Sequence, residues 1–161
     1  METDPAKDTA AEAVALATVE HHHAGMLTRL HSLTGALVRA VTEHDQSAEH
    51  DAHAVLVEWC EDDLLPHALA EESSLYRPAQ QKAEARLLVE GMLREHQAIA
   101  DLLEELRGSE GVRAAAAAST LERIFALHLE KENRLLLPFI AGAPDLSLAA
   151  AVEGLHELTG E

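Results

Sequence analysis

Apolar residues recur at steps of three and four along most of the chain, which is the spacing of one face of an α-helix. One such series spans residues 16–41, and a second spans residues 56–75. A third covers residues 89–106, and a fourth covers residues 121–139, including Leu135 and Phe139, after an alanine-rich start. The pattern predicts four long helices, followed by a short fifth helix from about Ser147 to Leu158.

Polar and helix-breaking stretches separate these series. HDQSAEHD (residues 44–51) has no apolar anchor and predicts a turn, and GSEG (108–111) and AGAPD (141–145) predict two more. The second helix is expected to stop around Arg77 and Pro78, because a residue before proline disfavours helix. Pro66 lies inside the second series and predicts a kink beside His67.

Short connections between long helices force neighbouring helices to run antiparallel. The predicted fold class is therefore all-α, an antiparallel up-down-up-down four-helix bundle with a short extra C-terminal helix. We expect a disordered tail at residues 1–8, the bundle at residues 9–142, and a C-terminal helix at residues 143–161 that packs on the bundle.

Composition supports this fold and narrows the function. Of 161 residues, 47% are hydrophobic but only 2% are aromatic, which is typical of a helical protein. The net charge of -17 repels polyanions, so we expect neither a nucleic-acid partner nor a membrane surface. With a single cysteine and neither a basic leader nor a long apolar run, the chain is expected to be cytoplasmic.

Four histidines, His23, His67, His96 and His128, each interrupt one of the apolar series. The chain midpoints between successive ones lie in or beside the predicted turns, so an antiparallel bundle brings all four imidazoles to one level of its core. Two of them begin a His-x-x-x-Glu pair, which places a carboxylate on the next turn of the same face. The candidate metal ligands are His23, His67, Glu71, His96, His128 and Glu132.

Glu71 and Glu132 lie in apolar stripes, where an uncompensated carboxylate would cost several kcal/mol in lost hydration. No lysine or arginine shares those stripes, so a metal is the best compensation. Imidazole and carboxylate without thiolate suit iron, manganese or zinc, and glutamates on two helices are suited to bridge a pair of ions. Six protein ligands leave two octahedral ions open positions for an external ligand.

At these residues the chain resembles the hemerythrin-like family, or HHE cation-binding domain. The family pattern is a histidine, His-x-x-x-Glu, a histidine and His-x-x-x-Glu on successive helices, and it matches His23, HALAE (67–71), His96 and HLEKE (128–132). The resemblance implies two non-haem iron ions, with manganese or zinc as substitutes. It also implies dioxygen (O2), hydrogen peroxide (H2O2) or nitric oxide (NO) as the small ligand.

The chain departs from the oxygen-carrying hemerythrins, which resemble it but have a second histidine on the third helix and an aspartate after the fourth-helix histidine. Ala100 and Asn133 stand at those positions, which argues against reversible oxygen carriage. His156 is a candidate replacement as a fifth ligand, a donor behind the ligands, or a gate, because the midpoint between it and His128 falls in the AGAPD turn.

Several alternatives stay open. His22 is an alternative first-helix ligand, and Glu20, one turn before His23, is a weaker candidate to join the ligands. Tyr76 is expected to pack rather than to line an approach to the metals. We expect packing roles for Cys60 and Trp59, and exposed or helix-end positions for four other histidines: His31, His44, His50 and His53.

Two function classes fit the sequence best. One is a diiron oxidase or peroxidase that reduces dioxygen or peroxide and oxidises a small substrate. The other is a non-catalytic module that senses or buffers iron, oxygen or nitric oxide, and it requires a separate signalling or redox partner protein. A metal-free helical interaction protein is a weaker third reading.

Overall fold

The computed structural model describes residues 6–159, with side chains up to Leu155, and these residues form helices and no strand. The all-α prediction is confirmed. The α-helices are α1 (Thr9–Thr42), α2 (Gln46–Trp59), α3 (Leu65–Glu71), α4 (Arg77–Gln80), α5 (Ala83–Arg107), α6 (Gly111–Lys131), α7 (Leu137–Gly142) and α8 (Leu148–Thr159). Three π-helices, η1 (Cys60–Leu64), η2 (Glu72–Tyr76) and η3 (Glu132–Leu136), connect some of them without a break.

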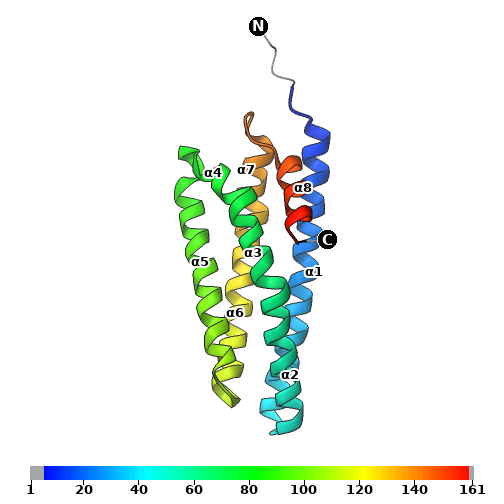
Figure 1. The fold of residues 1–161 in the computed structure, drawn as a ribbon, viewed down its shortest axis with the longest axis vertical. Coiled ribbons are helices and arrows are strands. Elements are labelled where there is room, and N and C mark those ends of the chain that lie inside the picture. Colours follow the sequence, from blue (N-terminus) through cyan, green and yellow to red (C-terminus); the bar gives the residue numbers. More distant parts are fainter. Residues whose placement is uncertain (1–5, 160–161) are drawn as a thin grey trace.

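The helices lie side by side along one long axis (Figure 1). The chain descends along α1, returns along α2 to α4, descends along α5 and returns along α6 and α7, with α8 folded back against α1. The most extensive contacts between helices are those of α5 with α6, α1 with α2, and α1 with α6. No helix in the described part of the chain is long and apolar enough to cross a membrane.

The turn between the first two long helices is shorter than predicted. Helix α2 already begins at Gln46, so most of the predicted turn at residues 44–51 is helical. Asp45 explains the difference, because its carboxylate accepts a hydrogen bond from the backbone N–H of Ala48 and caps the helix. His44, with a φ of 54°, lies at the point where the chain reverses direction between α1 and α2.

The second helix does not stop at Pro78 as expected. Each of Pro66, Pro78 and Pro138 follows a π-helix, and the residue before each proline donates its backbone N–H to the carbonyl five residues earlier. The wider turn absorbs the proline, so the second long helix continues to Gln80 instead of stopping at Arg77.

The π-helix η3 also corrects the predicted core. A steady helix would bury Leu135, but that side chain is 52% exposed and Leu136 is fully buried instead. A π-turn holds more residues than an α-turn, so the inward position moves by one residue.

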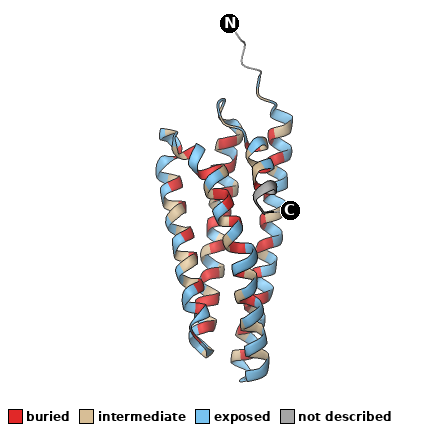
Figure 2. Ribbon diagram, viewed as in Figure 1, coloured by how far each residue is buried: buried red, intermediate tan, exposed pale blue. Residues whose placement is uncertain are grey.

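Two apolar clusters fill the interior. One lies around Leu37, Leu56 and Leu106, and the other around Leu75, Val89 and Ile140. The four histidines and two glutamates belong to neither cluster and form a polar layer between them. Figure 2 shows that the buried positions face inward along every long helix.

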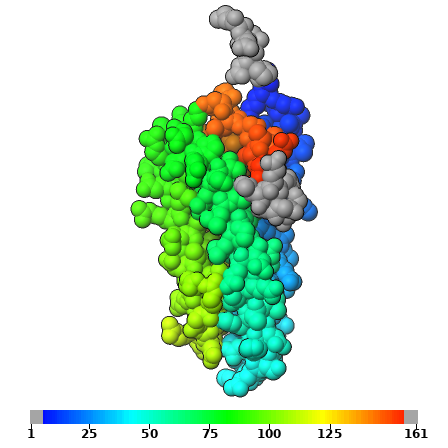
Figure 3. Space-filling view, viewed as in Figure 1, coloured from blue at the N-terminus to red at the C-terminus, as the bar shows by residue number. Residues whose placement is uncertain are grey.

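A buried carboxylate holds the final helix in place. Glu12 on α1 accepts hydrogen bonds from the backbone N–H groups of Leu148 and Ala149 and from the hydroxyl of Ser147, at 2.7, 3.3 and 2.9 Å. It therefore caps α8 from a different helix. In the space-filling view, the described part of α8 lies against the segment of α2 to α4 (Figure 3).

Candidate metal centre

The six predicted ligands all lie inside the helix bundle, and none is more than 7% exposed. His23 comes from α1, His67 and Glu71 from α3, and His96 from α5. His128 comes from α6, and Glu132 begins η3. The structure thus brings all six to one level, from four separate helical segments.

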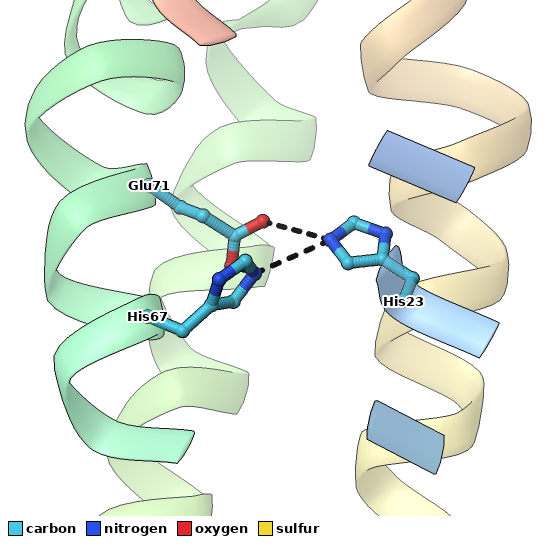
Figure 4. A group of neighbouring side chains, drawn as sticks. All are labelled: His23, His67 and Glu71. Carbon is cyan, nitrogen blue, oxygen red and sulfur yellow. Dashed lines mark hydrogen bonds and ion pairs between the residues drawn. The ribbon is translucent and has the colours of Figure 1, made fainter. Parts of the chain in front are cut away.

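One group consists of His23, His67 and Glu71 (Figure 4). The Nε2 atom of His23 lies 3.3 Å from Glu71 Oε2 and 3.4 Å from His67 Nε2. His67 Nε2 lies 3.4 Å from Glu71 Oε1. Each residue turns a potential ligand atom toward the others, so the group could hold a cation. We call this the His23/His67 position.

A second group consists of His96, His128 and the same Glu71. The Nε2 atoms of His96 and His128 are 3.0 Å apart. Glu132 Oε2 lies 3.1 Å from His128 Nε2. We call this the His96/His128 position. Glu71 therefore belongs to both groups.

Glu132 also spans the two positions. Its Oε2 atom is beside His128, and its Oε1 atom lies 3.4 Å from His23 Nε2. That Oε1 atom is buried and makes no hydrogen bond. A buried carboxylate oxygen without a hydrogen bond is costly, and a cation would satisfy it.

Tyr76 corrects one prediction, because its hydroxyl is part of the site. The hydroxyl donates to Glu132 Oε2 at 2.8 Å and lies 2.8 Å from His128 Nε2 and 3.3 Å from His96 Nε2. The side chain is 1% exposed. The expected packing role was wrong because the π-helix η2 turns Tyr76 toward the imidazoles.

Three of the four imidazoles have a hydrogen-bond partner on the side facing away from the site. His23 Nδ1 lies 2.7 Å from Asn133 Oδ1, His96 Nδ1 lies 2.8 Å from Glu72 Oε1, and His128 Nδ1 lies 3.0 Å from Glu95 Oε1. Acceptors at Nδ1 keep the proton there and leave each Nε2 free to bind a metal. Sequence spacing did not identify these outer partners.

The ionisable groups influence one another strongly in the metal-free protein. Burial alone would lower the pKa of His23, but the carboxylates of Glu132 and Glu71 outweigh it and raise that pKa to about 9. Burial and the neighbouring Glu71 raise the pKa of Glu132 to about 7. Burial opposes ionisation of Glu71 as well, yet the imidazoles of His67 and His23 hold its pKa well below the ordinary value.

The other sequence candidates lie outside the two groups. His22 is partly buried, and its ring centre lies 5.1 Å from that of His67. Glu20 is exposed, and the side chain of His156 lies outside the described residues. Cys60 is fully buried, and burial and Glu61 raise the pKa of its thiol to about 12.

Two surface cavities approach the His23/His67 position. One, of about 350 Å³, lies between α1 and the α2–α3 segment and is lined by His22, Trp59 and His67, among others. The second, of about 280 Å³, lies between α1 and the α6–η3 segment and includes His23 and Asn133 in its lining. Neither cavity is lined by His96 or His128.

Comparison with protein families now identifies the chain. The family model of the hemerythrin HHE cation-binding domain matches residues 14–140, which include all six predicted ligands. The chain belongs to this family. No curated protein and no solved structure matches it. As a member of the hemerythrin HHE family, it has a cation-binding domain whose buried His/Glu groups could hold metal.

Proposed function

We propose that this hemerythrin-like protein holds two non-haem iron ions and binds or reduces dioxygen or peroxide there. Nitric oxide is a further candidate ligand. In this proposal the four long helical segments form the up-down-up-down bundle, residues 9–142 are its functional unit, and residues 143–161 pack on it. The bundle supplies a rigid frame, because each ligand is held by a helix rather than by a loop.

The burial of two carboxylates among four imidazoles is the observation that carries the proposal. None of the described lysine and arginine side chains is buried, so in the metal-free protein only protonated imidazoles neutralise Glu71 and Glu132. The Oε1 atom of Glu132, which is buried and makes no hydrogen bond, points to the same conclusion. Nitrogen and oxygen donors without thiolate suit iron, and manganese and zinc also suit them.

The proposed ligands are His23, His67, Glu71, His96, His128 and Glu132. Glu71 and Glu132 would bridge the two positions, and the phenol oxygen of Tyr76 is placed to add a donor at the His96/His128 position. When bound, iron supplies redox chemistry and open coordination positions. The protein's own part is to fix the imidazole orientations, exclude bulk water and provide buried acid and base groups.

The cavities suggest where a small ligand enters. The route past Trp59 and His22 ends at His67, so we expect an external ligand to reach the His23/His67 position first. The same route suits a small reducing substrate. An oxidase or peroxidase would take up that substrate by this route in each catalytic cycle.

The alternative is a non-catalytic module that senses or buffers iron, oxygen or nitric oxide. The observation that favours it is the packing of α8 on α3 and η2, because a helix in contact with the segment that carries His67 and Glu71 could transmit a change to a partner protein. This role predicts ligand binding without consumption of oxygen or peroxide.

Metal analysis of protein purified without oxygen tests the proposal. We expect about two iron ions per chain and a change in the visible spectrum on adding oxygen or peroxide. Continuous consumption of either supports the enzyme, whereas a single reversible spectral change supports the sensor. Glu132→Ala should lose iron, while Glu130→Ala, an exposed carboxylate on the same helix, should keep it. Retention of full iron content by Glu132→Ala would refute the proposal.

A further inference from the structure

The two metal positions are related by an internal repeat, but their surroundings differ in charge. Placing His23 on His96 also places Met26, Leu30 and Leu33 on three residues of α5: Ile99, Leu103 and Leu106. All six of these apolar side chains are buried. Placing His67 on His128 likewise pairs Glu71 with Glu132. The repeat therefore identifies which residues around one metal position correspond to which residues around the other.

The first corresponding pair is Glu72 and Asn133, each directly after a ligand glutamate. Glu72 lies against Nδ1 of His96 at 2.8 Å, and Asn133 lies against Nδ1 of His23 at 2.7 Å. The contact is the same in both halves, but one acceptor is a carboxylate and the other is a neutral amide.

The second pair is Glu95 and His22, each directly before a ligand histidine. Glu95 lies 3.0 Å from Nδ1 of His128, whereas the ring of His22 packs against that of His67. Lys131 contacts the other oxygen of Glu95 at 2.5 Å and offsets part of its charge. The half-exposed Glu72 has no such partner among the described ion pairs.

The third pair is Tyr76 and Leu137, each five residues after a ligand glutamate. The hydroxyl of Tyr76 reaches His96 and His128, whereas Leu137 is a fully buried apolar residue. In each of the three pairs, the carboxylate or phenol is the member that contacts His96 or His128.

We infer that the two positions bind cations unequally, with the His96/His128 position taking the first ion and holding it more tightly. An imidazole that donates its Nδ1–H to a carboxylate is a more basic ligand at Nε2, and loss of such an outer partner typically weakens metal binding by about 10- to 100-fold. The His23/His67 position, with an amide partner and adjoining cavities, is the weaker and more exchangeable one. This inference rests on the proposed dinuclear site.

Titration of the metal-free protein with Co²⁺ under argon, followed by calorimetry and visible absorption, tests the inequality. We expect two equivalents to bind in two resolved steps. Glu72→Gln keeps the hydrogen bond but removes the charge, and it should weaken the first step about tenfold while sparing the second. Asn133→Asp should strengthen the second step by a similar factor.

The control is Glu90→Gln, which removes one exposed carboxylate from the helix that carries His96. It should change neither step by more than about twofold, because surface charges are screened. Two equal binding steps in the unaltered protein, or a Glu72→Gln effect confined to the second step, would overturn the unequal affinity of the two positions but not the metal centre. Binding of less than one equivalent would overturn the proposed metal centre itself.

Discussion

Replacement of Glu132 by glutamine should stabilise the metal-free protein and weaken its hold on metal. Glu132 is fully buried, and its pKa is raised from 4.5 to about 7, chiefly by burial and then by Glu71. Between those pH values the folded protein keeps a proton that the unfolded chain has lost. Stability therefore falls as the pH rises through this window.

The size of the effect follows from the same values. At about 1.4 kcal/mol per pH unit, the raised pKa costs the metal-free fold on the order of 3 kcal/mol above pH 7. Glutamine has nearly the same shape and can still accept a hydrogen bond from Tyr76. Because His23 loses a charged neighbour, we expect a net gain of about 2 kcal/mol at pH 8 and almost none at pH 4.

Denaturant unfolding at both pH values, with a chelator present and helicity followed by circular dichroism, measures this gain. Glu130→Gln, on the exposed face of the same helix, should change stability by less than about 0.5 kcal/mol at either pH. With Co²⁺ bound, the order should reverse, since the variant lacks a charged ligand. A Glu132→Gln protein that is less stable than the parent at pH 8 without metal would refute the view that this carboxylate awaits a cation.

Three further predictions follow from single residues. The pKa of His23 is raised to about 9, so below pH 9 a metal must displace its proton. Co²⁺ affinity should therefore rise about tenfold per pH unit for each proton displaced, and a flat pH profile would contradict this. Glu12→Ala uncaps α8, and it should lower the free energy of unfolding by about 1–2 kcal/mol and speed hydrogen exchange in α8, with Co²⁺ binding unchanged. Tyr76→Phe removes the donor to Glu132, and it should cost the metal-free fold about 1–3 kcal/mol and abolish the visible phenolate absorption that we expect of the ferric protein. An unchanged spectrum would show that the phenol is not a ligand.

Much of the fold and the six inward-facing residues could be predicted because each follows from helical spacing alone. His67 and Glu71 share a face since four residues make about one turn. His23 and His96 reach the same level because the chain reverses midway between successive histidines. These regularities depend on short-range geometry, which the order of apolar and polar residues records directly.

The outer partners could not be predicted in the same way, because they depend on contacts between helices. Glu72 and Glu95 are partly exposed, and in the sequence they are two of many glutamates on polar faces. Only the packing of the second long helix beside α5, and of α5 beside α6, shows that each faces an imidazole. Asn133 was identified as a departure from a family pattern, while its contact with His23 required the structure.

The π-helices do leave a trace in the sequence, and it explains why Leu135 and Tyr76 were misplaced. An ordinary amphipathic helix mixes steps of three and four, because its turn holds about 3.6 residues. Across each π-helix the buried positions advance by four twice in succession. The three buried runs are Leu56, Cys60, Leu64; Glu71, Leu75, Ala79; and Glu132, Leu136, Ile140.

A proline follows two residues after each π-helix and cannot donate the backbone hydrogen bond that an α-turn requires. Such four-residue steps ahead of or across a proline therefore predict a wide turn there. Applied to the second long helix, this rule makes Leu75 the inward residue and moves the next side chain, Tyr76, toward the metal layer.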